Sequence, residues 1–281
     1  MEKKQFSLAH LTVIGCSPSE MIHIAARTGY DFVSIRLIPM GVEGEFKCLS
    51  QDKTMIRETR DALNSTGVKM LDLELARIMD DVLPETYLPA MEVAAELGAS
   101  HVISSAWTRH HNEREFIVER YAEICDLAAP LGLTVDLEFP TFSSITTLKE
   151  ATDIVRSADR PNSGILIDTL YLYFSGVCLD ELESLPPEWL HFMHICDTEA
   201  SLPATLDKIR HVARDDRKYI GEGRIDFDSI LERMPVSIYS IELPNSARVK
   251  EYGYEEHARR CLLSAKKCFE HPEDKVSSTI S

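Results

Sequence analysis

The chain has 281 residues, with 30 lysines and arginines against 46 aspartates and glutamates, so its formal net charge is −16. This balance argues against a basic surface for duplex nucleic acid or for anionic lipid. The hydrophobic content of 44% is that of a folded protein, and no segment reaches the ~20 apolar residues that span a bilayer. We therefore expect no nucleic-acid partner and no membrane partner.

The N-terminus and the cysteines bear on the cellular compartment. Residues 1–6 lead into no apolar run and no small-residue cleavage site, so no signal peptide is expected. The 7 cysteines are scattered and include no CxxC pair. This usage is typical of reduced thiols, and we predict a cytoplasmic location.

A unit of helix, glycine and apolar strand recurs along the chain. The first helix is expected to begin after Ser17, a favoured N-cap that is followed by proline, and to end before Gly29. Later helices are expected to end before Gly67, Gly98 and Gly132, because glycine adopts the left-handed backbone that often follows a helix. The predicted strands are residues 6–11, 32–37, 68–74, 102–105, 133–139, 164–168, 190–195 and 236–243, and the last helix is residues 254–269.

Eight such units predict an α/β protein with a single (β/α)₈ TIM barrel domain. Short runs rich in valine, isoleucine and leucine suit parallel strands that helices cover from outside. We assign residues 1–272 to the barrel and residues 273–281 to a polar C-terminal tail. A doubly wound open sheet is the alternative, but no GxGxxG motif follows the first strand.

Polar side chains end four consecutive predicted strands. The fifth to eighth strands end in Glu138, Asp168, His194 and Glu242, and the C-terminal ends of barrel strands share one rim. Three carboxylates and one imidazole suit a hard or borderline divalent cation, and without one the carboxylates would repel each other. We predict a divalent metal cofactor, with manganese expected first and magnesium, cobalt and zinc as alternatives.

The sequence around these positions resembles a known superfamily. Glu138 stands in LEFP, Asp168 in LIDT, His194 in HICD and Glu242 in IELP, while GEGRIDF occupies residues 221–227. Together they resemble the xylose-isomerase-like TIM barrels, which include sugar phosphate isomerases and epimerases, ketose 3-epimerases, dehydratases and an AP-endonuclease-2-like branch. The resemblance covers nearly the whole chain, and it implies that these four residues are metal ligands.

Two positions depart from that pattern. Many relatives carry D-x-x-H after the sixth strand, whereas this chain has Tyr171 three residues after Asp168. Ketose 3-epimerases carry a further glutamate six residues after the strand-five glutamate, where this chain has Ser144. Tyrosine donates a hydrogen bond but is a poor ligand for these metals at neutral pH. Both differences argue against 3-epimerisation of a free sugar.

The candidate ligands predict proton-transfer chemistry. Glu138 and Glu242 are the expected catalytic bases for removing the proton next to a carbonyl, giving an enediolate that a divalent cation stabilises. We expect an isomerase or epimerase that acts on a small polyhydroxy carbonyl compound, a sugar or sugar acid. The alternative is a lyase that dehydrates a keto-cyclitol or a dehydroshikimate-like acid, or splits a 3-oxo-glycoside. A non-catalytic binding subunit and a DNA-repair endonuclease are less favoured.

Further side chains near strand ends are candidates for contact with the substrate. The predicted substrate-binding residues are His10, Arg36, Trp107, Tyr171 and Arg224. Arg36 would grip a carboxylate or phosphate with two N–H groups, or would instead pair with Glu74. The expected partner is therefore a small molecule, anionic if Arg36 is free to bind it.

Three further expectations concern supporting groups. Glu74 is expected to support the ligands from the third strand, and Asp197 to orient the His194 imidazole. Arg217 and Lys218, with Arg224, form a second candidate anion site. The sequence leaves open whether residues 198–224 form a lid and whether the protein is a homo-oligomer.

Overall fold

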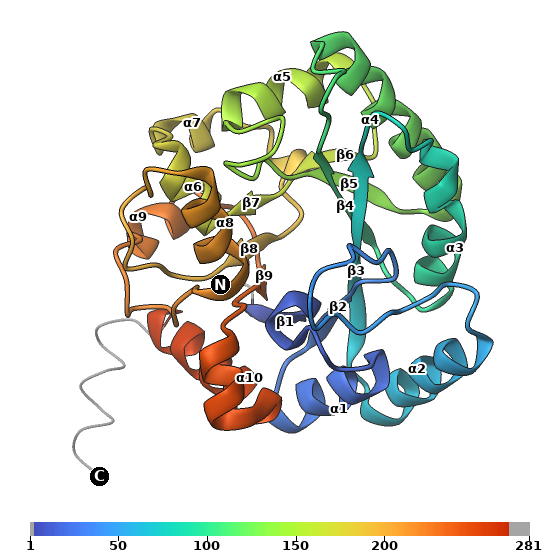
Figure 1. Cartoon of the computed structure of the whole chain (residues 1–281), viewed down its shortest axis with the longest axis vertical. Helices are drawn as coiled ribbons and strands as arrows, with labels where there is room; N and C mark the ends of the chain where they lie inside the picture. Colours follow the sequence, from blue (N-terminus) through green and yellow to red (C-terminus); the bar gives the residue numbers. More distant parts are fainter. Residues whose placement is uncertain (1–2, 270–281) are drawn as a thin grey trace.

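The computed structural model describes residues 3–269, and within them nine parallel strands surround the centre of the molecule (Figure 1). The strands are β1 (Gln5–Ala9), β2 (Phe32–Ile35), β3 (Lys69–Ile78), β4 (His101–Ala106), β5 (Thr134–Leu137), β6 (Ser163–Ile165), β7 (Ile167–Asp168), β8 (Met193–Ile195) and β9 (Ile238–Ile241). They are hydrogen-bonded in the order β6-β5-β4-β3-β2-β1-β9-β8-β7.

The two ends of this order belong to one strand. Only Leu166 separates β6 from β7, and β6 pairs with β5 while β7 pairs with β8. The sheet therefore closes into an eight-stranded parallel barrel. The predicted single (β/α)₈ domain is confirmed.

Helices form a ring outside the strands, and α10 lies beside α1 where the ring closes (Figure 1). The α-helices are α1 (Pro18–Thr28), α2 (Lys53–Thr66), α3 (Leu88–Glu96), α4 (Arg114–Ala128), α5 (Leu148–Ala158), α6 (Thr169–Ser175), α7 (Asp180–Glu183), α8 (Leu206–Asp215), α9 (Phe227–Leu231) and α10 (Ser246–Phe269). Short 3₁₀ turns are η1 (His10–Val13), η2 (Pro84–Tyr87), η3 (Ala129–Leu131) and η4 (Pro187–Trp189).

Local sequence accounts for the ends of these helices. Ser17 accepts a hydrogen bond from the backbone N–H of Glu20, and the Glu20 carboxylate accepts the N–H of Ser17, which forms a capping box before α1. Gly29 ends α1 with φ 92° and Gly67 ends α2 with φ 75°. A residue with a Cβ is strained in this left-handed backbone conformation, so each helix ends where a glycine follows it.

Two apolar layers hold the barrel. A large core lies between the strands and the ring of helices. A smaller cluster consists of Leu71, Leu75, Ile103, Leu166 and Phe192. Phe192 shares its face of the strand with His194, because alternate residues point the same way, so this cluster fills the inside of the barrel.

Some segments go beyond the predicted elements. Residues 198–224 contain helix α8, and α10 starts at Ser246, with an interruption at Gly253 where φ is 76°. The predicted tail 273–281 and the domain end at 272 lie outside the described residues.

In residues 3–269, no helix combines the length and the apolar character needed to cross a membrane.

Candidate metal centre

Four buried side chains converge at the C-terminal rim of the barrel. Glu138 follows β5, Asp168 ends β7, His194 lies in β8 and Glu242 follows β9. Asp168 is in register with His194, and His194 with Ser240, two residues before Glu242. Each of the four offers one ligand atom, and these atoms all lie within 4.8 Å of one another. The parallel register thus brings the four predicted positions to one level.

Several of these atoms have no hydrogen-bond partner in the protein. Nδ1 of His194 lies 3.6 Å from Oε1 of Glu138 and 3.6 Å from Oε2 of Glu242, which is too long for a good N–H···O bond. Within residues 3–269, neither imidazole nitrogen of His194 nor Oε1 of Glu138 has a hydrogen-bond partner, although all three atoms are buried. Such unpaired atoms are costly, and their spacing fits ligands that share one cation.

A buried arginine neutralises part of this acidic cluster. Nη1 of Arg217 lies 2.7 Å from Oδ2 of Asp168, and its Nη2 lies 2.8 Å from Oε2 of Glu242. The Arg217 Nε donates to the carbonyl of Ala213 over 2.8 Å, and Nη2 donates to the Tyr171 hydroxyl over 3.2 Å. Arg217 offsets one of the three carboxylate charges, so the charge that remains matches a divalent cation.

The carboxyl groups of Glu138 and Glu242 differ in proton affinity. Burial, opposed by the nearby His194, raises the pKa of Glu138 to about 7. Burial acts in the same direction on Glu242, but the positive charges of Arg217 and His194 outweigh it and lower the pKa of Glu242 to about 2. Glu138 therefore exchanges a proton near neutral pH, whereas Glu242 stays ionised.

The donor set fits a divalent metal ion. Carboxylate oxygens and an imidazole are ligands for manganese, magnesium, cobalt and zinc, in proportions that vary with the ion. Glu138, Asp168, His194 and Glu242 would hold such an ion, because they supply the unpaired atoms and the excess negative charge in one place.

Neighbouring strands carry a second acidic group. The Ser34 hydroxyl is within hydrogen-bond range of both Asp72 and Glu74, but it has only one proton to donate. Burial, with the charge of Glu74, raises the pKa of Asp72 well above its usual range. A protonated Asp72 donating to Ser34, which donates to Glu74, satisfies this group. Glu74 also accepts a 3.0 Å bond from Nε of Arg36.

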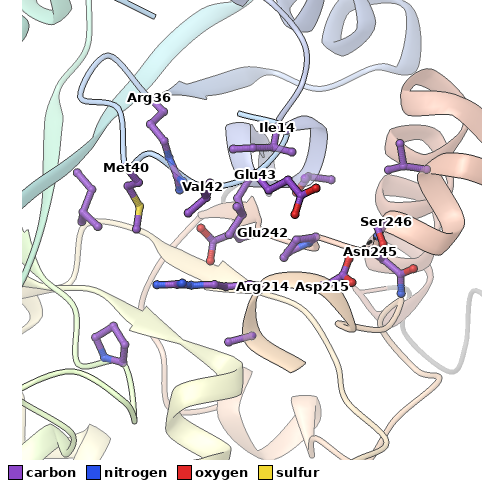
Figure 2. Close-up of a pocket in the computed structure, with 18 of the residues that line it drawn as sticks. Ile14, Arg36, Met40, Val42, Glu43, Arg214, Asp215, Glu242, Asn245 and Ser246 are labelled. Carbon is purple, nitrogen blue, oxygen red and sulfur yellow. Dashed lines mark hydrogen bonds between the residues drawn. The ribbon is translucent and has the colours of Figure 1, made fainter. Parts of the chain in front are cut away.

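A cavity of about 850 Å³ is lined in part by Glu138 and Glu242, and this volume suits a sugar-sized ligand. Figure 2 shows the Glu242 carboxylate in the cavity, between the guanidinium groups of Arg36 and Arg214 in that view. Residues 40–44, from the loop between β2 and α2, form part of the wall. The two predicted bases are thus accessible to a small molecule.

Aromatic side chains line another part of the cavity wall. The rings of Trp107 and Phe142 are tilted by 60° with their centroids 5.5 Å apart, and Phe142 meets Tyr171 edge-on at 5.9 Å. The Trp107 indole N–H donates to Ser105 over 2.7 Å, which fixes the ring. The structure therefore places two predicted substrate-binding residues, Trp107 and Tyr171, on the cavity.

The fold agrees with a comparison against protein families. A model described as "Xylose isomerase-like TIM barrel" matches residues 22–262. The chain belongs to this family. The matched residues contain all four candidate ligands, so the resemblance inferred from the sequence motifs is confirmed.

Curated relatives in this comparison are inosose isomerases. The chain is 29% identical over 157 residues to the one from Bacillus licheniformis, which covers 53% of this chain and 54% of the relative. It is 23% identical over 255 residues to the one from Halalkalibacterium halodurans, covering 85% and 86%. The match thus spans about half the length of the first relative.

Solved structures share the fold. The IOLI protein with a bound zinc atom superposes with a TM-score of 0.77 at 20% identity, covering 93% of this chain and 96% of that one. A D-allulose 3-epimerase from Methylomonas sp. in complex with D-allulose gives 0.69 at 17% identity (95% and 98%). A probable 3-DHS dehydratase from Bacillus anthracis gives 0.70 at 17% identity (93% and 98%). These solved structures therefore share the barrel fold of this chain.

Arg36 lines the cavity of this xylose isomerase-like barrel, but its guanidinium already pairs with acidic residues of the protein. Its side chain is buried and forms two N–H···O contacts with Glu74, and Nη1 lies 3.9 Å from Glu45. The alternative that Arg36 pairs with Glu74 is therefore confirmed. Glu74 contacts Arg36 and Ser34 and is absent from the cluster of four candidate ligands.

Two predicted substrate-binding residues do not line the cavity. His10 is buried, with Nε2 2.9 Å from the carbonyl oxygen of Cys16 and Nδ1 3.2 Å from the backbone N–H of Arg36. Both ring nitrogens are thus occupied by the protein. Arg224 is exposed outside the cavity, and its backbone N–H donates to Thr198. Neither His10 nor Arg224 therefore faces the cavity.

The prediction that Asp197 orients His194 is wrong. Its carboxylate accepts backbone N–H groups of Gly221 at 3.0 Å, Gly223 at 2.9 Å and Ile225 at 3.2 Å. Asp197 therefore anchors the loop that precedes α9. Within residues 3–269, no side chain hydrogen-bonds to the ring of His194.

The second predicted anion site is also wrong as a group. Arg217 is fully buried against the candidate ligands, whereas Lys218 pairs with Asp216 at 2.8 Å. Sequence reasoning missed Arg214, which is the arginine of this segment that lines the cavity. No motif marks it, since it lies in the last turn of a helix that was not predicted.

Another cluster of titratable side chains lies at the N-terminal ends of the strands. Oδ1 of Asp136 is 2.6 Å from Nδ1 of His191, and Nδ1 of His101 is 2.7 Å from the Thr134 hydroxyl. Gly164 makes room for it, because a Cβ there would lie 2.4 Å from Oδ1 of Asp136. These atoms already have protein partners, so the cluster is an ion pair within the fold.

Proposed function

We propose that the protein is a divalent-metal-dependent isomerase or epimerase of a small polyhydroxy carbonyl compound. The observation that carries the proposal is the four-residue cluster with unpaired buried atoms on the edge of a sugar-sized cavity. The inosose isomerases among its relatives and a D-allulose 3-epimerase of the same fold support this reaction class. Manganese is the expected ion, and zinc is the ion named for one solved neighbour.

Two carboxyl groups with different proton affinities suit a two-base reaction. A divalent cation, when bound, polarises a carbonyl and the hydroxyl beside it. Glu242, held ionised by Arg217, is placed to take the proton from the carbon next to that carbonyl. Glu138, which follows β5, would return the proton. Return to the neighbouring carbon gives isomerisation, and return to the opposite face gives epimerisation.

A lyase is the second candidate, and Ser144 favours it. In that reaction Glu138 would donate a proton to the departing hydroxyl. Ser144, which replaces the second glutamate of ketose 3-epimerases, bonds to the backbone N–H of Thr108 at 2.9 Å and lies outside the cavity lining. The probable 3-DHS dehydratase with this fold is consistent with such a reaction.

The test combines metal content with a substrate screen. Elemental mass spectrometry of protein purified without chelator is expected to find about one divalent ion per chain in the wild type and in Glu43→Gln, a cavity residue outside the cluster. The double variant Glu138→Gln/Glu242→Gln is expected to lose it. A screen of inososes and ketoses then separates products of unchanged mass from loss of water. Wild-type protein that takes up no metal on titration would refute the proposal.

A further inference from the structure

We propose that Arg214 binds an anionic group of the substrate, a carboxylate or a phosphate, so that the ligand of this centre is an acidic ketose. The inference rests on the proposed function, because it concerns the part of the same substrate that does not react. It names a substrate class and a specificity-determining residue.

Arg214 has a free guanidinium on the cavity. It lies in the last turn of α8 and lines the cavity together with Glu138 and Glu242. The guanidinium lies over the Phe142 ring, whose centroid is 5.5 Å from the guanidinium carbon. Among residues 3–269, no carboxylate pairs with Arg214 and no acceptor takes a hydrogen bond from it. Five N–H donors are therefore available to a ligand.

The Arg214 side chain extends into the cavity, where the substrate of the proposed reaction would bind. In Figure 2 the Arg214 guanidinium reaches into the cavity below the Glu242 carboxylate, on the side of Met40 and Arg36. The carboxylates of Glu43 and Asp215 lie on the other side, toward the start of α10. In that view Arg214 extends away from the carboxylates of Glu43 and Asp215 and toward the side of the Glu242 carboxylate.

The other arginines near this position do not replace it. The Arg36 guanidinium donates a hydrogen bond to Glu74. The Arg217 guanidinium forms ion pairs with two candidate ligands, Asp168 and Glu242. Burial, together with the positive charges of Arg210, Arg36 and Arg77, lowers the pKa of Arg214. An anion placed there would relieve this repulsion. A guanidinium binds planar oxyanions with paired hydrogen bonds and stays protonated at neutral pH.

The aromatic neighbour supports an oriented arginine. Phe142 contacts the guanidinium on one side and Trp107 and Tyr171 on others, so it is held in place. Stacking limits the rotamers of Arg214 and lowers the entropy lost when it grips a ligand. The cavity of about 850 Å³ has room for a six-carbon chain with its carbonyl at the candidate metal centre and its acidic end at Arg214.

A matched set of ketoses tests the proposal. D-fructose, D-fructose 6-phosphate and D-fructuronate differ at one end only, so calorimetric titration of the metal-loaded protein compares neutral, phosphate and carboxylate groups. We expect at least one charged ketose to bind about tenfold to hundredfold more tightly than D-fructose. In Arg214→Gln this ratio is expected to fall toward one, and Arg214→Lys is expected to restore part of it.

The control is Lys208→Gln, which removes an exposed positive charge from the same helix that is not among the charges acting on Arg214. It is expected to keep the wild-type ratio. The stronger of the two charged ketoses identifies carboxylate or phosphate as the group bound. Circular dichroism and metal content check that each variant is folded and loaded.

Three results would overturn the assignment of Arg214. They are equal binding of charged and neutral ketoses by the wild type, no binding of either charged ketose by metal-loaded protein, and an unchanged ratio in Arg214→Gln. Metal content and the D-fructose titration report on the proposed function, whereas the ratio reports on Arg214. The two proposals can therefore fail separately.

Discussion

Arg217 forms ion pairs with two of the candidate metal ligands. It is fully buried, and its guanidinium bridges Asp168 and Glu242, which stand on different strands. Three carboxylates in one buried cluster repel each other, and Arg217 reduces that repulsion before any cation binds. It also keeps Glu242 ionised, which a base requires.

Replacing Arg217 by methionine is expected to destabilise the metal-free protein by about 3–5 kcal/mol, because it leaves two buried carboxylates without their partner. Arg217→Lys is expected to lose less stability, because lysine keeps the positive charge but lacks the planar set of guanidinium N–H donors. Urea unfolding in chelator measures both. Equal stability of the methionine variant and the wild type would show that Arg217 does not neutralise the cluster.

His191 makes stability depend on pH. Burial opposes its charge, but the hydrogen bond and the negative charge of Asp136 outweigh burial and raise its pKa. A group with a raised folded-state pKa stabilises fully below its unfolded value of about 6.5, and this contribution is lost as the pH rises through the folded value.

His191→Gln is therefore expected to cost about 1–3 kcal/mol at pH 6, where the charged hydrogen bond is intact, and less at pH 9. Unfolding free energies at the two pH values provide the measurement. His211→Gln, on an exposed face of α8, serves as the control. A cost that is independent of pH would contradict an ion pair between His191 and Asp136.

At the scale of elements, one loop positions Arg217. Asp197 follows β8 and holds the backbone of Gly221, Gly223 and Ile225. Its backbone N–H and carbonyl also bond with Lys218, the residue after Arg217. The loop between α8 and α9 is thereby tied to the strand that carries His194.

Asp197→Asn is expected to lower stability by about 2–3 kcal/mol, because an amide NH₂ replaces an acceptor that faces several N–H donors. Metal affinity is expected to fall with it, since Arg217 loses its support. Asp216→Asn, which affects the partly buried pair with Lys218, is the control. Thermal melts and metal titration test this, and an unaltered Asp197→Asn protein would show that the loop is held by other contacts.

At the scale of the whole molecule, the candidate ligands come from β5, β7, β8 and β9, which span half of the barrel wall. A cation bound to all four would join strands that are far apart in the sequence. It would also bind the folded state alone, because the unfolded chain does not hold these residues together.

Saturating metal is therefore expected to stabilise the protein by about 2.7 kcal/mol at a hundredfold excess over Kd. This corresponds to a rise in Tm of about 5–10 °C for a domain of this size. Differential scanning fluorimetry with and without chelator measures it. The variant Glu138→Gln/Glu242→Gln is expected to show no response, and a response of wild-type size would place the metal elsewhere.

The barrel and the candidate ligands were predictable because their signals are local. Short apolar runs and glycines such as Gly29 and Gly67 mark strands and helix ends, since backbone preferences act within a few residues. Once the strands are parallel, their C-terminal ends share a rim, so Glu138 and His194 meet without any further information. The sequence by itself therefore determined the fold and the positions of the four candidate ligands.

The partners of charged side chains were decided only by the tertiary structure. Arg36 pairs with Glu74, Asp197 binds the loop near Gly221, and Arg217 enters the core beside Asp168, 49 positions away along the chain. Arg214 lines the cavity as Arg36 does, but within residues 3–269 no carboxylate pairs with it. A charge attracts any opposite charge nearby, so its partner depends on how the loops between the strands are packed and not on a pattern along the chain.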